Sequence, residues 1–109
     1  IQGFALHPGV ILTGLQKHTP TEELQAFGVI KQDGTLSELC KTVEQGAATS
    51  VYAALAPELV NHGGAYLEDC AISRGLNTSP EYWGMGPHVL DRDNAERLWK
   101  LSEQLVASK

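Results

Sequence analysis

Residues 41–59, KTVEQGAATSVYAALAPEL, carry the strongest local pattern in the chain. Thr42 and Gln45 have the spacing of a capping box, in which two side chains bind the first backbone N–H groups of a helix. Apolar residues then recur near the helical period at Val43, Ala47, Val51, Leu55 and Leu59. Pro57 should end or bend this helix, because proline lacks the N–H that a helix interior needs.

This helix has small side chains on part of its surface. Small residues stand at Gly46, Ala47, Ala48, Ala53 and Ala54, and they allow close packing against a sheet or another helix. On either side of the helix lies a short apolar run: GFAL, residues 3–6, stops at Pro8-Gly9, and AYLEDC, residues 65–70, ends in acids. Each run predicts a strand. A strand, a helix and a strand in that order predict a parallel crossover unit and an α/β fold.

Two further helices are expected. The first spans residues 20–27, with Thr19 as its cap and Gly28 at its end. The second spans residues 93–106, with Asp93 as its cap. Its apolar side would hold Ala95, Leu98, Trp99, Leu105 and Val106. Between the elements, Asp33-Gly34 reads as a turn, and residues 71–89 read as an irregular surface segment.

Composition limits the classes of function. With 109 residues the chain forms at most one domain with a modest core. A net charge of -5, without a basic stripe, argues against a nucleic-acid partner. No apolar run reaches the roughly 18 residues that span a bilayer, and the start lacks a signal-peptide pattern. These features predict a soluble, cytoplasmic protein, and the opening IQGFAL, already inside a strand, indicates a cut chain.

Most polar residues have an ordinary explanation. The four histidines and two cysteines lack metal-ligand spacing, so a metal site is not expected. Cys40 and Cys70 are expected to be free, buried thiols. Glu68 and Asp69 are adjacent and should point to opposite faces of a strand, as a solvated strand end. The NTS triplet at Asn77 matches a glycosylation sequon, but nothing else in the sequence points to secretion.

The stretch HPGVILTGL, residues 7–15, is different. A strand that ends in Pro-Gly exposes its carboxyl end, where open parallel sheets bind ligands. Pro8 fixes the bend, and Gly9 lets another group approach the backbone closely. Taken alone, this pair is more often a plain turn.

In order and spacing, HPGVILTGL, TVEQGAATSVYAALAPEL and GGAYLEDC resemble the C-terminal third of short-chain dehydrogenases/reductases. The similarity is greatest to the retinol-dehydrogenase-like and WW-domain-oxidoreductase-like branch common in fungi. It implies the last two strands, crossover helix, substrate-lobe helix and C-terminal helix of a Rossmann-like doubly wound parallel sheet. Residues 1–109 would then be a single incomplete domain, with part of the substrate lobe at about 12–40 and the C-terminal helix at about 90–109.

The resemblance also implies roles for the P-G-x-x-x-T motif of Pro8, Gly9 and Thr13. Pro8 and Gly9 would line the nicotinamide of NADP or NAD, and the backbone of Ile11 would meet its carboxamide. The hydroxyl of Thr13 would bond the carboxamide or a phosphate oxygen. A backbone and a hydroxyl can supply the donor and acceptor that a carboxamide needs.

Other parts of the family pattern are absent from the sequence. The phosphate-binding G-x-x-x-G-x-G loop does not occur, and neither does the catalytic Y-x-x-x-K pair. The tyrosines Tyr52, Tyr66 and Tyr82 are followed four residues later by Ala56, Cys70 and Gly86. We therefore expect a part of an oxidoreductase that acts on small or lipophilic alcohols, aldehydes or ketones and is inactive alone. Its partner would be the missing N-terminal portion or another copy of the chain.

Two alternatives stay open. A truncated homologue could serve as a non-catalytic interaction or oligomerisation module through the Thr42 helix and the Tyr66 strand. The second alternative is that the chain is a small α/β binding domain unrelated to this family.

Overall fold

The computed structural model describes residues 1–77 and 84–107. Residues 1–73 form one compact unit and residues 74–109 form a second. Each unit is described by itself. The predicted irregular segment at 71–89 falls partly on residues 78–83, and Tyr82 also lies outside the described residues.

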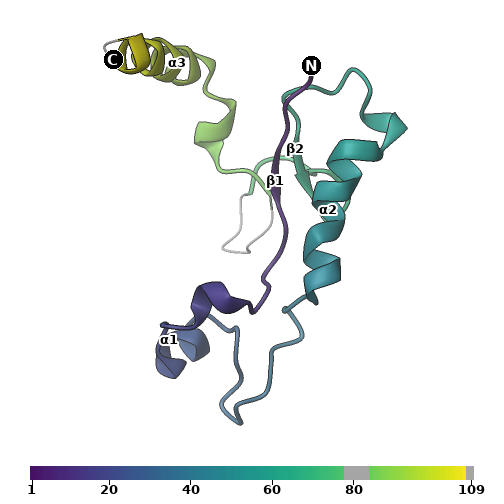
Figure 1. The fold of residues 1–109 in the computed structure, drawn as a ribbon, viewed down its shortest axis with the longest axis vertical. Coiled ribbons are helices and arrows are strands. Elements are labelled where there is room, and N and C mark those ends of the chain that lie inside the picture. The colour runs from purple at the N-terminus through teal and green to yellow at the C-terminus, as the bar shows by residue number, and fades with distance from the viewer. Residues whose placement is uncertain (78–83, 108–109) are drawn as a thin grey trace. The chain divides into compact units, whose positions relative to one another are not determined.

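The first unit contains the expected crossover. Strand β1 (Ala5–His7) pairs in parallel with β2 (Tyr66–Glu68), with Ala5 opposite Tyr66 and His7 opposite Glu68. Helix α2 (Val43–Leu55) connects them and contacts both strands (Figure 1). The prediction of a parallel strand, helix and strand is confirmed, although each strand is only three residues long.

A third strand was not predicted. Strand β3 (Ala71–Ile72) pairs antiparallel with β2, so the sheet is mixed and has the order β1-β2-β3. The turn that joins β2 to β3 consists of Asp69 and Cys70, with φ of 50° and 55°. Two-residue hairpins favour positive φ at both positions, and the usual sequence there is Asn-Gly or Asp-Gly. The sequence Asp-Cys carries no such signal.

Helix α2 begins and ends where its sequence predicts. The Thr42 hydroxyl accepts from the Gln45 N–H at 3.2 Å, and the Gln45 amide oxygen accepts from the Thr42 N–H at 2.9 Å. At the other end, the N–H of Ala56 bonds the carbonyl of Tyr52 at 2.9 Å. Pro57 then begins the short 3-10 helix η2 (Pro57–Leu59), which confirms the predicted end.

The face of α2 that packs is its small-residue flank. Gly46 and Thr49 are buried, and a Cβ atom placed on Gly46 would lie 2.6 Å from Cγ1 of Ile11. The predicted close packing is therefore confirmed. The apolar row lies elsewhere on the helix: Val43 is 63% exposed and Leu55 is 76% exposed.

The core is small, as the chain length predicts. Among the described residues, the buried hydrophobic side chains are Leu24, Leu59 and Leu67. In the described part of the chain, the largest side chains with less than 2% exposure are those of Leu67, on β2, and Thr49, on α2. The packed centre of this unit is therefore the contact between α2 and the strands.

The segment between β1 and α2 holds the 3-10 helix η1 (Gly14–Gln16) and helix α1 (Thr21–Ala26). Helix α1 confirms the element predicted at 20–27, and Gly28, with φ of 68°, follows it. The predicted cap is wrong. Pro20 occupies the N-cap position and makes no side-chain cap bond. The Asp33-Gly34 turn is confirmed, because Asp33 accepts from the N–H of Thr35 at 2.9 Å.

The second unit contains the 3-10 helix η3 (Pro87–Leu90) and helix α3 (Arg92–Ala107). Helix α3 confirms the predicted C-terminal helix, but its cap is Asp91 and not Asp93. The carboxylate of Asp91 accepts from the N–H of Asn94 at 2.9 Å and from its side-chain amide at 2.6 Å. Along the described ranges, no helix is both long and apolar enough to cross a membrane.

Candidate functional site

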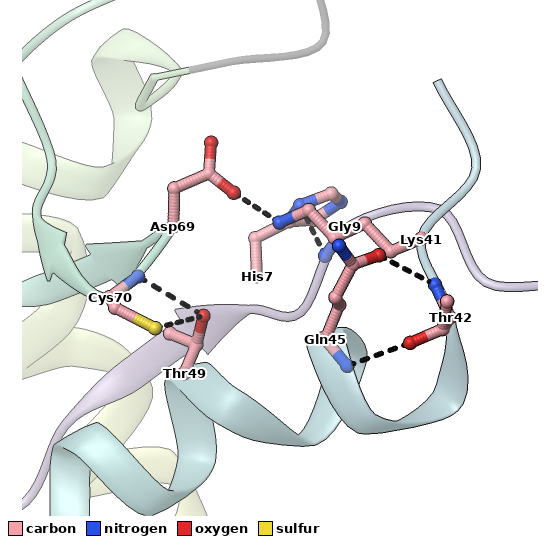
Figure 2. A network of polar contacts seen from close by, with 8 residues as sticks. All are labelled: His7, Gly9, Lys41, Thr42, Gln45, Thr49, Asp69 and Cys70. Carbon is pink, nitrogen blue, oxygen red and sulfur yellow. Dashed lines mark hydrogen bonds and ion pairs between the residues drawn. The ribbon is translucent and has the colours of Figure 1, made fainter. Parts of the chain in front are cut away.

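The candidate residues lie at the carboxyl ends of the parallel strands. Pro8 and Gly9 follow the last residue of β1, and Val10 then forms an isolated parallel bridge with Cys40. The turn of Asp69 and Cys70 follows the last residue of β2. Because β1 and β2 are parallel, both connections leave the sheet at the carboxyl ends of the strands, on the same side of the sheet (Figure 2).

Gly9 is a point of close approach. Its φ is 97°, a conformation that side chains rarely adopt, and its N–H donates to Nδ1 of His7 at 3.2 Å. A Cβ atom on Gly9 would lie 2.6 Å from Cδ of Lys41. The group that glycine admits here is therefore the aliphatic stem of Lys41. Pro8, beside it, is exposed.

Lys41 spans the two strand ends. Its ammonium group forms an ion pair with the carboxylate of Asp69, while its stem lies on Gly9 (Figure 2). The side chain of Lys41 is 21% exposed and that of Asp69 is 53% exposed. The pair thus ties the turn after β2 to the turn after β1.

The turn after β2 is also tied to α2. The Thr49 hydroxyl is fully buried and accepts from the N–H of Cys70 at 3.3 Å, with the Cys70 sulfur 3.9 Å away (Figure 2). This hydrogen bond lets α2 fix the end of β2.

Ile11 and Thr13 are joined by a third residue, Gln16. The Gln16 side-chain amide donates to the carbonyl of Ile11 at 3.2 Å. The Gln16 amide oxygen accepts from the N–H of Thr13 at 2.9 Å and from its hydroxyl at 3.2 Å. The Thr13 hydroxyl also accepts from the N–H of Leu15 at 3.2 Å, which caps η1.

Sequence reasoning did not single out Gln16, although a signal was available. Residues 13–16, TGLQ, have the same T-x-x-Q spacing that identified the capping box of Thr42 and Gln45. The element that follows, η1, is only three residues long, so no apolar period drew attention to it.

Two predictions about polar groups near β2 are wrong in part. Glu68 is not solvated, because it is 9% exposed and accepts from the Ser73 hydroxyl at 2.8 Å. The antiparallel return of β3 brings Ser73 back over the strand.

Cys40 and Cys70 are free, as predicted, but Cys40 is half-buried and Cys70 is exposed at the turn.

Neither described tyrosine near the sheet is activated as a base. Burial raises the pKa of the Tyr66 phenol, and the nearby Glu68 carboxylate adds to this rise. Desolvation raises the pKa of Tyr52, with a smaller contribution from Glu58. A raised pKa keeps each phenol protonated near neutral pH. Within the described ranges, no group of three or more His, Cys, Asp or Glu side chains could hold a metal ion.

The chain is similar to proteins named as oxidoreductases. A "Probable oxidoreductase" of Streptomyces lividans is 43% identical over 107 residues, which cover 95% of this chain and 36% of that protein. The corresponding protein of Streptomyces antibioticus is 43% identical over 99 residues, covering 88% of this chain and 33% of that protein. The "Short-chain dehydrogenase/reductase prx1" of Penicillium roqueforti is 36% identical over 110 residues, covering 97% of this chain and 31% of that protein.

No family model and no solved structure matches the chain. The chain spans about a third of the length of the curated relatives that it matches, from 31% to 36% in these three. Over nearly its whole length, this α/β chain is thus homologous to a part of proteins named oxidoreductase and short-chain dehydrogenase/reductase.

Proposed function

We propose that residues 1–109 are the C-terminal part of an NAD(P)-dependent short-chain dehydrogenase/reductase that acts on small or lipophilic alcohols, aldehydes or ketones. The observation that carries the proposal is the match of nearly the whole chain to about a third of proteins named oxidoreductase or short-chain dehydrogenase/reductase. The P-G-x-x-x-T motif of Pro8, Gly9 and Thr13 lies at the carboxyl end of β1, where parallel sheets bind ligands. The retinol-dehydrogenase-like branch and the cytoplasmic location stay predictions.

In this proposal the chain supplies one wall of the nicotinamide pocket. The bound cofactor supplies hydride chemistry, and the residues of this chain bind and orient it. Pro8 and Gly9 line the ring, and the backbone of Ile11 and the hydroxyl of Thr13 hold the carboxamide. The groups fit this ligand, because Ile11 offers a carbonyl acceptor and Thr13 offers donors, which already bond one amide side chain. Residues 12–40 would form part of the substrate lobe.

The rest of the site would come from another polypeptide segment. The sequence has neither the phosphate-binding glycine loop nor the Y-x-x-x-K pair, so no residue here is assigned to proton transfer. Strand β1 lies at one edge of the described sheet, and an edge strand can pair with a further strand. Val43, Val51 and Leu55 on α2 are all more than half exposed. These surfaces suit docking by the missing N-terminal portion or by a second copy.

A chimera tests the proposal directly. Residues 1–109 would replace the homologous third of the Streptomyces lividans protein, and NADH and NADPH binding would be titrated by calorimetry. We expect the chimera to bind one of them and the isolated chain to bind neither. Submicromolar binding by the isolated chain would refute the view that its site is incomplete. A correctly folded chimera that binds neither cofactor would refute the proposal itself.

Thr13 has its own test in the chimera. Thr13→Ala removes the hydroxyl and should weaken cofactor binding, whereas Thr21→Ala, an exposed threonine in α1, should leave it unchanged. Equal dissociation constants for the two variants would remove Thr13 from the site.

The edge of β1 is tested by the oligomeric state. Size-exclusion chromatography with light scattering should find dimers or aggregates of the isolated chain. A stable monomer that unfolds cooperatively would contradict the exposed-edge argument.

The alternative is a non-catalytic interaction module. The exposed apolar row of α2, at Val43, Val51 and Leu55, favours it, because a single exposed row of this kind suits a protein partner. Intact mass and the upstream reading frame decide where the natural polypeptide begins. A natural chain that starts at Ile1, binds no NADH or NADPH and forms a defined oligomer would favour this alternative over the enzyme.

A further inference from the structure

The carboxamide of Gln16 lies between Ile11 and Thr13, where it also completes the capping box of η1. Its amide nitrogen donates to the Ile11 carbonyl at 3.2 Å, and its oxygen accepts from Thr13 N–H at 2.9 Å. The Thr13 hydroxyl adds a bond of 3.2 Å to the same oxygen. The side chain thus uses both the donor and the acceptor function of a primary amide.

The Ile11 carbonyl and the Thr13 hydroxyl are the groups that the proposed function gives to the carboxamide of nicotinamide. A primary carboxamide carries one oxygen acceptor and two N–H donors, whether it belongs to glutamine or to nicotinamide. The hydroxyl of Thr13 has a single proton and already donates it to the Gln16 oxygen. The carboxamides of Gln16 and of nicotinamide therefore cannot both make these hydrogen bonds at full strength.

We propose that Gln16 is a competitor built into the chain, whose carboxamide occupies the subsite for the nicotinamide carboxamide and leaves it when the cofactor binds. The inference rests on the proposed function. It adds a residue that sets the affinity for the cofactor.

Release of Gln16 requires little rearrangement. The contact involves one side chain, and the residues that it touches are exposed or half-buried, so water can replace its bonds. The N–H of Leu15 still donates to the Thr13 hydroxyl after Gln16 has left, because that bond does not involve the glutamine. The backbone of residues 11–16 therefore keeps a local bond that holds Thr13 in place.

The size of the effect follows from the population of the open site. A partly exposed contact of this kind leaves the subsite free in only a fraction of molecules, and the apparent dissociation constant rises by the inverse of that fraction. Gln16→Ala removes the competitor, so the dissociation constant for NADH or NADPH should fall about fivefold. Gln16→Met, which keeps the length of the side chain without its amide, should have the same effect.

The test uses the natural polypeptide that carries residues 1–109, with fluorescence titration of NADH and NADPH. Gln25→Ala is the matched control, because the Gln25 amide donates to the carbonyl of Lys31 at 3.3 Å, away from the subsite. We expect tighter binding in both Gln16 variants and no change in the control. In NMR spectra of the wild-type protein, the Gln16 side-chain NH2 signals should move toward those of a solvated glutamine when the cofactor is added.

Other results separate this inference from the function on which it rests. Cofactor binding that is unchanged or weaker in Gln16→Ala and Gln16→Met would overturn the competitor and leave the cofactor site standing. A gain in Gln16→Ala alone would also overturn it, because bulk and not the amide would be responsible. No cofactor binding by the wild type or any variant would refute the proposed function, and the competitor with it.

Discussion

Gly46 is the residue whose replacement most directly tests how α2 supports the candidate site. A Cβ atom there would lie 2.6 Å from Cγ1 and 2.8 Å from Cδ1 of Ile11, well inside ordinary contact distance. Ile11 is β-branched and stiff at χ1, so it cannot avoid the new methyl group by a small rotation. Overpacking of this kind costs about 2 kcal/mol, within a range of about 1 to 3.

The same substitution has a favourable effect on the helix. Alanine is better than glycine in a helix interior by about 1 kcal/mol. We therefore expect Gly46→Ala to destabilise the protein by about 1 kcal/mol. With Ile11→Ala already present, the clash disappears, and Gly46→Ala should instead stabilise by about 1 kcal/mol. The coupling energy between the two positions is then about 2 kcal/mol.

Urea unfolding of the natural polypeptide, followed by circular dichroism at the helix band, measures this double-mutant cycle. Ala47→Gly is the control, because Ala47 is exposed on the same helix and should cost about 1 kcal/mol with or without Ile11. Equal effects of Gly46→Ala in both backgrounds would refute the packing of Ile11 against this glycine. Because the carbonyl of Ile11 belongs to the proposed carboxamide subsite, the single variant should also weaken cofactor binding.

Three shorter predictions concern the turns. Cys70→Gly should stabilise the protein by up to about 1 kcal/mol in urea unfolding, because Cys70 has φ of 55° and glycine adopts that conformation without strain; a loss of stability would contradict this. Thr49→Val should cost about 1 to 2 kcal/mol, since the buried hydroxyl that accepts from the Cys70 N–H is removed, whereas Ser50→Val on the exposed face should cost less than 1. The Thr35 hydroxyl, and then its N–H, hold the pKa of Asp33 below its ordinary value of 3.8, so the carboxylate stabilises the turn above about pH 4 and this contribution is lost as pH falls through the folded pKa. The Thr35 amide shift in NMR should follow that titration in wild type and lose it in Asp33→Asn.

The crossover was predictable because its signals are local. The capping box at Thr42 and Gln45 lies in four consecutive residues, and Pro57 lacks the N–H that would continue the helix past Ala56. Between two short apolar runs, such a helix leaves the parallel crossover as the expected arrangement.

The face of α2 that packs was harder to predict from periodicity. Val43 and Leu55 follow the helical period but remain exposed, while Gly46 and Thr49 are buried. Apolar spacing shows that a helix is amphipathic, but the partner decides which side is covered. Here the close contact of Ile11 selects the side without a bulky residue.

The remaining differences depend on contacts between segments. Burial of Glu68 requires the return of Ser73 over β2, and this return uses a turn of Asp69 and Cys70 without glycine or asparagine. For the candidate site, the sequence was sufficient to place residues 8–13 at the end of β1. It did not show that Gln16 forms hydrogen bonds with Ile11 and Thr13, because these bonds depend on the position of the Gln16 side chain.

The contact between Gly9 and Lys41 has a consequence for the way this sequence can change over generations. Any side chain at position 9 would collide with the stem of Lys41, whose Cδ lies 2.6 Å from the place of a Cβ. A lineage that replaces the glycine must therefore move or shorten the lysine side chain, and either change disturbs its ion pair with the acid at position 69. Substitutions at positions 9, 41 and 69 should therefore co-vary among relatives of this sequence. Positions 9 and 41 are 32 residues apart, and positions 41 and 69 are 28 residues apart.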